Sequence, residues 1–122
     1  GIGEFLVGAY EPKTDKFLTI CKVGSGATDE EWVKLEKELK ALKVDKKPER
    51  YEVAKQYDQD FWVQPKLVLE IVCNEISESP AHTSGFGLRF PRLISWREKK
   101  PEDATTINEI KDMFKLNKKG GE

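Results

Sequence analysis

Leu88-Arg89-Phe90-Pro91-Arg92-Leu93-Ile94-Ser95-Trp96-Arg97-Glu98-Lys99-Lys100-Pro101-Glu102 is the stretch of this chain that decides its fold. Its first ten residues are rich in apolar and aromatic side chains, which predicts a strand over residues 88–97. Proline has no backbone N–H to donate to a strand ladder, so Pro91 predicts that this strand bulges or lies at the edge of a sheet.

The same stretch concentrates positive charge. Residues 88–100 hold five basic side chains and one acidic side chain, a local charge of +4, whereas the whole chain carries −1. A planar guanidinium gives two charge-assisted hydrogen bonds to a phosphate, and an aromatic ring can stack on a base or wedge into a groove. Phe90, between Arg89 and Arg92, therefore indicates contact with nucleic acid. The alternative is an edge strand whose charges protect it from aggregation.

The composition indicates a single globular domain. The chain has 122 residues, of which 38% are hydrophobic and 35% charged. No apolar run approaches the roughly 20 residues that span a bilayer, and there is no signal-peptide pattern. The chain begins without Met, directly at a predicted strand, which suggests a cut at a domain boundary. Cys21 and Cys73 are expected to be buried free thiols of an intracellular protein rather than a disulfide. One histidine, His82 in an exposed loop, and no Cys-x-x-Cys spacing argue against a metal site.

The remaining elements follow from local patterns. Strands are expected over residues 4–10, 17–23 and 66–77, with a turn at 11–15 and a loop at 79–87. Thr28 and Glu31 form a predicted capping box for a helix over residues 29–42, whose apolar stripe is core. A final helix is expected from Thr105 or Thr106 to residue 116. Residues 43–60 show no clear pattern and are left unassigned.

The quoted stretch resembles the Leu-Arg-Phe-Pro-Arg…Arg-Glu-Asp-Lys signature of ATP-dependent DNA ligases, the last nucleotidyltransferase motif of that family. Lys99 stands where the family usually has Asp. Other segments resemble the family in the same order along the chain: residues 5–17, 21–30, 62–71, 77–80 and 101–106. The resemblance therefore covers nearly the whole chain.

The resemblance implies a mainly-β fold. In that family this region is an oligonucleotide-binding (OB) domain, a five-stranded barrel with one inserted helix and a C-terminal helix. We expect it to occupy residues 1–116, with a flexible tail over 117–122. The strand pattern alone would fit other small barrels, so the OB assignment follows from the resemblance.

The resemblance also implies a role as part of an ATP-dependent DNA ligase. The domain would bind the minor groove of nicked double-stranded DNA and help to encircle it. The DNA-binding residues would be Lys22, Gly24, Ser25, Gly26, Arg89, Phe90 and Arg92. In a second orientation the basic residues Arg97 and Lys100 would act in self-adenylation, carried out with an upstream nucleotidyltransferase domain.

The family implies ATP and Mg²⁺ in the full-length enzyme and neither in this chain alone. The chain has no Lys-x-Asp-Gly adenylation motif, so alone it is expected to be inactive. It is expected to be a monomer of the cytoplasm or nucleoid, without a membrane partner.

Each site residue also has a structural interpretation. Phe90 would be a core residue, Arg97 would pair with Glu98 or Glu102, and the Gly24-Ser25-Gly26 segment would be a plain connection. The alternative function is a free-standing OB-type nucleic-acid-binding module without ligase chemistry.

Overall fold

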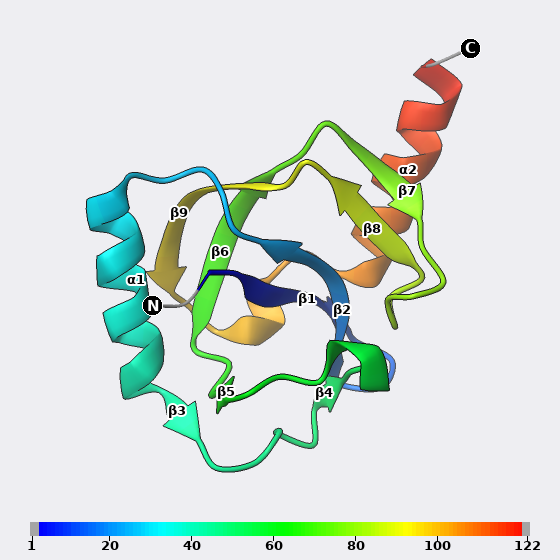
Figure 1. Cartoon of the computed structure of the whole chain (residues 1–122). Coiled ribbons are helices and arrows are strands. Elements are labelled where there is room, and N and C mark those ends of the chain that lie inside the picture. Colours follow the sequence, from blue (N-terminus) through cyan, green and yellow to red (C-terminus); the bar gives the residue numbers. More distant parts are fainter. Residues whose placement is uncertain (1–2, 121–122) are drawn as a thin grey trace.

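The computed structural model describes residues 3–120, and side chains as far as residue 117. It is mainly β, as expected, with two helices (Figure 1). The helices are α1 (Asp29–Ala41) and α2 (Ile107–Gly120), and two 3₁₀ turns are η1 (Lys55–Tyr57) and η2 (Pro101–Asp103). The strands are β1 (Phe5–Glu11), β2 (Lys16–Val23), β3 (Lys43–Val44), β4 (Tyr51–Glu52), β5 (Trp62–Val63), β6 (Leu67–Val72), β7 (Glu75–Glu78), β8 (Phe86–Arg89) and β9 (Arg92–Glu98).

The first two strands form the predicted hairpin. β1 and β2 pair antiparallel from Phe5 opposite Val23 to Glu11 opposite Lys16, with a bulge between Val7 and Gly8. β2 also pairs in parallel with the two-residue strand β4. Residues 43–60, which show no clear pattern in the sequence, contain β3, β4 and η1. All three are too short to show a sequence period.

The described strands are not hydrogen-bonded into the closed barrel that was expected. Within residues 3–120 the strands form four separate ladders, namely β1-β2-β4, β3-β5, β6-β9 and β7-β8. Single bridges join Tyr10 of β1 to Thr106, and Gly26, three residues after β2, to Leu93 of β9. The mainly-β class fits an OB-like domain, but its sheets are open at several edges.

Each of the two long predicted strands is broken in two. Val72 pairs with Arg92, and Glu75 pairs with Arg89, so the breaks at residues 73–74 and 90–91 lie opposite each other. The N–H of Asn74 donates to the carbonyl oxygen of Arg89 across the break, at 2.9 Å. One bent antiparallel pair therefore replaces two continuous strands, and the bend lies at Pro91, where the ladder lacks a donor.

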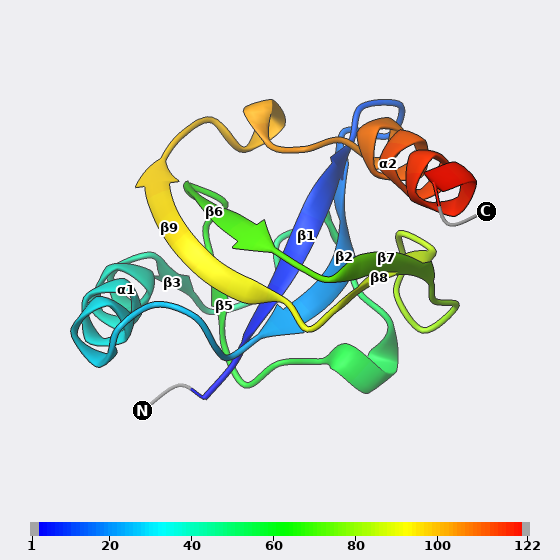
Figure 2. The same ribbon diagram turned by 90° about the horizontal axis from the view of Figure 1, so that it is seen from above.

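Two apolar clusters hold the fold together. Ala9, Ile20 and Cys21 pack against Ile107 and Ile110 of α2. The second cluster, at the other end of the hairpin, joins Phe5 and Val23 to Leu35 of α1 and Leu93 of β9. The two helices consequently lie at opposite ends of the molecule (Figures 1 and 2).

The helix caps follow the sequence. The Thr28–Glu31 capping box is present, and in α1 Leu35 is buried, with Trp32 and Leu39 packed beside it. Thr106 and Glu109 exchange hydrogen bonds at the start of α2. The expected end of this helix was wrong, because α2 runs to Gly120. The predicted tail thus overlaps the helix, and its last two residues lie outside the described part.

Candidate nucleic-acid interface

Phe90 occupies the bend between β8 and β9 in an unusual conformation. Its φ is 53°, in the left-handed region, and its side chain is 65% exposed. A non-glycine residue pays about 1–2 kcal/mol for this conformation. The interpretation of Phe90 as a core residue was therefore wrong. Strained backbone positions of this kind cluster at binding and active sites, and this one directs a large apolar ring into solvent.

The Gly24-Ser25-Gly26 segment lies directly beside this bend. Leu93 N–H donates to the carbonyl oxygen of Ser25 at 2.9 Å, and Ala27 N–H donates to that of Leu93 at 3.0 Å. The Ser25 hydroxyl donates to the Pro91 carbonyl oxygen at 3.2 Å. The segment is thus more than a plain connection, since it fixes the bend from one side.

Gly26 is required for this close approach. Its φ is +94°, and a Cβ atom built on it would lie 2.3 Å from the carbonyl oxygen of Leu93. Only glycine adopts this conformation without strain and leaves room for the neighbouring backbone. Trp32 of α1 donates its indole N–H to the carbonyl oxygen of Gly26 at 3.2 Å. Gly26 therefore links α1 to the start of β9, next to the bend that carries Phe90.

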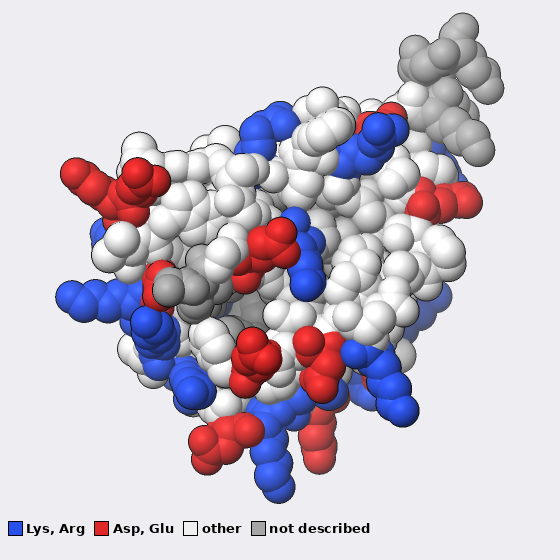
Figure 3. Space-filling view, in the orientation of Figure 1, with Lys and Arg blue, Asp and Glu red and all other residues white. Residues whose placement is uncertain are grey.

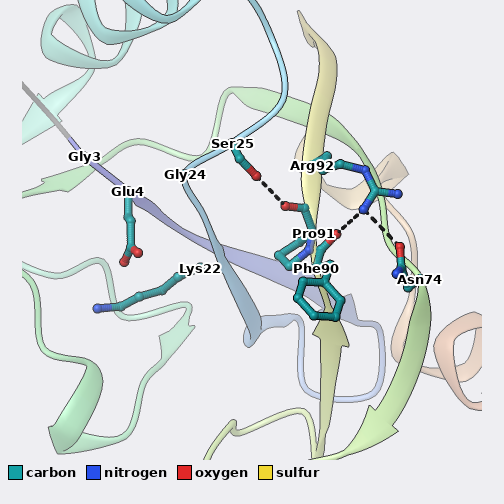
Figure 4. A pocket seen from close by; sticks show the side chains of 9 residues that line it. All are labelled: Gly3, Glu4, Lys22, Gly24, Ser25, Asn74, Phe90, Pro91 and Arg92. Atoms are coloured by element: carbon teal, nitrogen blue, oxygen red, sulfur yellow. Dashed lines mark hydrogen bonds between the residues drawn. The ribbon is translucent and has the colours of Figure 1, made fainter.

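These elements enclose an open pocket of about 680 Å³. Five of the seven predicted DNA-binding residues line it, namely Lys22, Gly24, Ser25, Phe90 and Arg92 (Figure 4). Gly3, Glu4, Asn74 and Pro91 complete the lining. We call this hollow the Phe90 pocket. The lining residues come from four separate parts of the chain, and two of these parts contain the five predicted DNA-binding residues.

The two arginines at the bend are held in place by neighbours. Arg92 Nη1 donates to the side-chain oxygen of Asn74 at 3.0 Å and to the Phe90 carbonyl oxygen at 2.8 Å. Arg89 Nη1 pairs with Glu75 at 2.9 Å, and its guanidinium lies 5.8 Å from the centre of the Phe90 ring. Asn74 and Glu75 were missed in the sequence because only the strand register brings them here.

The charge on this side of the molecule is mixed. In Figure 3 blue and red groups lie next to each other, and no continuous positive surface is seen on the face shown. Glu4 lies in the Phe90 pocket together with Lys22 and Arg92. A phosphate would therefore be bound at defined points and not by a general positive field.

Arg97 and Lys100 lie elsewhere. Both are exposed, Arg97 near the end of β9 opposite Val68, and Lys100 at the start of η2. Arg97 follows Arg92 by five positions along β9, a distance of about 17 Å in an extended strand. Glu102, suggested as a partner of Arg97, pairs with Arg50 at 3.0 Å instead. The predicted basic stripe is thus divided between the two ends of β9.

The two cysteines and the histidine lie outside the Phe90 pocket. Cys21 and Cys73 are free, as predicted, but only Cys21 is buried. The expectation of a buried thiol was wrong for Cys73, which is half-buried at the break between β6 and β7. Burial raises the pKa of the Cys21 thiol to about 12, so it is protonated at neutral pH. The expectation that His82 is an exposed loop residue was wrong: it is half-buried, with Nδ1 3.0 Å from the Thr19 hydroxyl oxygen.

Two further features of residues 3–120 bear on the kind of site. No group of three His, Cys, Asp or Glu side chains in this part of the chain is arranged to hold a metal ion. Neither of its helices is long and apolar enough to cross a membrane.

A family model and individual relatives both match this chain to DNA ligases. Residues 1–100 match the family model described as the ATP dependent DNA ligase C terminal region. The chain is 47% identical to a DNA ligase of Hyperthermus butylicus over 123 residues, which cover 93% of this chain and 20% of that protein. It is 44% identical to a probable DNA ligase of Dictyoglomus thermophilum over 128 residues, covering 98% of this chain and 22% of that protein. The chain spans about a fifth of the length of these relatives.

Proposed function

Because this chain belongs to the family of C-terminal regions of ATP-dependent DNA ligases, we propose that its Phe90 pocket binds the minor groove of nicked duplex DNA. The enzyme of which it would form part seals nicks with ATP (EC 6.5.1.1). The observation that carries the proposal is the exposed, left-handed Phe90 in a pocket that also contains Lys22 and Arg92.

The pocket offers both kinds of contact that a duplex needs. Lys22 and Arg92 supply cations, and the backbone of Gly24 allows close approach to a phosphate. The Ser25 hydroxyl donates to the Pro91 carbonyl oxygen, so Ser25 would contribute by fixing the bend. The Phe90 ring supplies an apolar surface that fits between sugars or against a base step in the minor groove. Arg92 donates through Nη1 to the side-chain oxygen of Asn74, and the other guanidinium nitrogens remain able to donate to phosphate.

A second face would act in self-adenylation. Arg97 and Lys100, at the far end of β9, would approach the polyphosphate of ATP when an upstream nucleotidyltransferase domain closes on this one. Fixed cations near a leaving pyrophosphate stabilise the charge that develops there. The full-length enzyme would use ATP and Mg²⁺ in this step.

The separation of the two faces supports two orientations of the domain. One end of β9 would face DNA and the other would face nucleotide, so both could not approach the same active site at once.

We further propose that the enzyme acts as a monomer on DNA in the cytoplasm or nucleoid. A Lys-x-Asp-Gly motif upstream of residue 1 in the gene would support the ligase. A start codon there would support a free-standing module.

The binding of a nicked duplex by the full-length enzyme tests the proposal. Phe90→Ala and Arg92→Ala should each weaken binding by about 5–100-fold, the range for an aromatic or charged contact to nucleic acid. Lys34→Ala, which removes an exposed lysine of α1, is the matched control and should bind like the wild type. Normal binding by Phe90→Ala would overturn the proposal.

Salt dependence provides a second measurement. A few phosphate contacts should make the affinity fall with a log–log slope of only a few units. Arg92→Ala should reduce this slope by about one unit, whereas Phe90→Ala should leave it unchanged. An affinity that does not change with salt would contradict a phosphate contact.

A further inference from the structure

We propose that Tyr57, with His82 stacked on it, is a positioning residue that holds Lys22 ready for a DNA phosphate. The inference rests on the proposed function of the Phe90 pocket. It assigns a role to the segment around η1, for which the sequence showed no pattern. The chain of contacts runs from the pocket to Lys22, from Lys22 to Tyr57, and from Tyr57 to His82.

The three side chains lie in direct contact. The Lys22 ammonium is 5.8 Å from the centre of the Tyr57 ring. The Tyr57 ring in turn stacks on the His82 ring, with 4.5 Å between ring centres and 8° between planes. A cation over an aromatic face is attracted by the electron density of the ring. The Tyr57 ring is therefore placed to hold the end of a long, flexible lysine side chain.

The stack is itself firmly anchored to the strand that carries Lys22. His82 Nδ1 lies 3.0 Å from the hydroxyl oxygen of Thr19, three residues before Lys22 on β2. Thr19 N–H donates to the Thr83 hydroxyl at 2.9 Å, and that hydroxyl donates to the carbonyl oxygen of Glu52 at 2.6 Å. The loop that bears His82 is thus hydrogen-bonded to both β2 and β4. These bonds hold the His82 ring in position against Tyr57.

Glu4 explains why such a device is needed. Glu4 and Lys22 line the same pocket and extend to the same side of the strands, away from Phe90 (Figure 4). A Lys22 side chain without a fixed position would be free to pair with the Glu4 carboxylate, and its charge would then be compensated. The Tyr57 ring attracts the ammonium without neutralising it. The cation remains available to a phosphate.

Pre-organisation is the expected benefit. A lysine side chain loses much rotamer freedom when it is fixed on binding, and this loss reduces affinity. Contact with Tyr57 restricts Lys22 before DNA arrives, so a smaller loss remains on binding. The effect should therefore appear in the affinity for DNA and depend on the presence of Lys22.

The test is a set of variants of the full-length enzyme, measured for affinity to nicked duplex DNA. Lys22→Ala should weaken binding about 3–10-fold and lower the salt slope by about one unit. Tyr57→Leu should weaken binding by a similar factor, and the double variant should be no weaker than Lys22→Ala alone. Tyr57→Phe retains the ring and should bind like the wild type. Glu4→Gln should restore affinity to Tyr57→Leu.

A matched control removes a second ring that lies under a lysine. The Lys43 ammonium is 5.6 Å from the centre of the Phe61 ring, and neither residue lines the Phe90 pocket. Phe61→Leu should therefore leave the affinity for DNA unchanged. Thermal melting of every variant identifies a change that merely unfolds the domain. Lys22→Ala alters an exposed side chain and keeps the inference testable if Tyr57→Leu is unstable.

Two outcomes would overturn the inference. One is additive loss in the Lys22→Ala and Tyr57→Leu double variant, and the other is normal binding by Lys22→Ala. Neither would overturn the proposed function, because Phe90→Ala and Arg92→Ala test that separately. If Phe90→Ala and Arg92→Ala lose binding while Lys22→Ala binds normally, the proposed function of the Phe90 pocket stands and the role of Tyr57 is rejected.

Discussion

At the scale of single residues, Phe90 combines backbone strain with an exposed side chain. Most strained positions are occupied by glycine, which has no Cβ and adopts positive φ freely. A phenylalanine at φ 53° carries a strain energy that glycine would not carry. Its exposed ring adds little to the packing of the core. The strain and the exposure therefore separate the role of the ring from the stability of the domain.

Replacement of Phe90 by glycine and by alanine tests this separation. Because glycine relieves the left-handed strain and alanine does not, Phe90→Gly should be more stable than Phe90→Ala by about 1 kcal/mol. Both should bind nicked DNA equally weakly. Ile94 in β9 is 48% exposed and is the control, since at an ordinary strand position glycine should be less stable than alanine. The same order at both positions, measured by urea unfolding, would contradict the strain argument.

His82 makes the stability of the domain depend on pH. Burial lowers the pKa of His82, so in the unfolded chain the imidazole binds a proton at higher pH than in the folded protein. The free energy of unfolding should therefore decrease as the pH falls through about 6.5, and the loss is complete below the folded pKa.

His82→Gln cannot titrate but can still form a hydrogen bond with Thr19. Its melting temperature should fall less between pH 8 and pH 5 than that of the wild type. Parallel curves for the two proteins would show that His82 does not carry this dependence.

At the scale of elements, the features that can be predicted from the sequence are those whose determinants lie close together along the chain. The Thr28–Glu31 capping box and the β1–β2 hairpin were predicted because their determinants lie within a few residues of each other. The bend at Pro91 was anticipated as a bulge. Its partner break at residues 73–74 was not, because only the register of two distant strands creates it.

The candidate site follows the same rule. The family resemblance identified five residues that line the Phe90 pocket. It did not identify Asn74, Glu75 or Tyr57, which enter through pairing or stacking between distant segments. It also did not show that Arg97 and Arg92 lie at different ends of one strand, since a row of basic residues in sequence contains no information on where a strand turns.

Helix α1 contributes to the site by packing against its support. Leu35 is fully buried among Phe5, Val23 and Leu93. Leu35→Ala should lower the free energy of unfolding by about 2–5 kcal/mol because it leaves a cavity. Val33 on the same helix is 66% exposed, so Val33→Ala should change it by less than about 0.5 kcal/mol. Equal effects in denaturant unfolding would mean that α1 is not docked as described.

At the scale of the whole molecule, the two ends of β9 predict a crossed pattern of defects in the full-length enzyme. Arg97→Ala and Lys100→Ala should slow self-adenylation, by up to about 10²-fold if each stabilises charge on the pyrophosphate. They should affect the sealing of pre-adenylated nicks less. Phe90→Ala should show the opposite pattern, with normal self-adenylation and poor sealing, because its ring lies about 20 Å or more from the other end of the strand.

Formation of protein-bound AMP from labelled ATP and sealing of a pre-adenylated nick measure the two steps separately. Lys99→Asp, which introduces the residue usual in the family, should not reduce self-adenylation if Arg97 and Lys100 are the cations that act there. A large loss in Lys99→Asp would instead mean that Lys99 has taken over part of that role. Equal defects of Arg97→Ala in both steps would assign that end of β9 to DNA or to stability, and the two faces of the domain would then share one function.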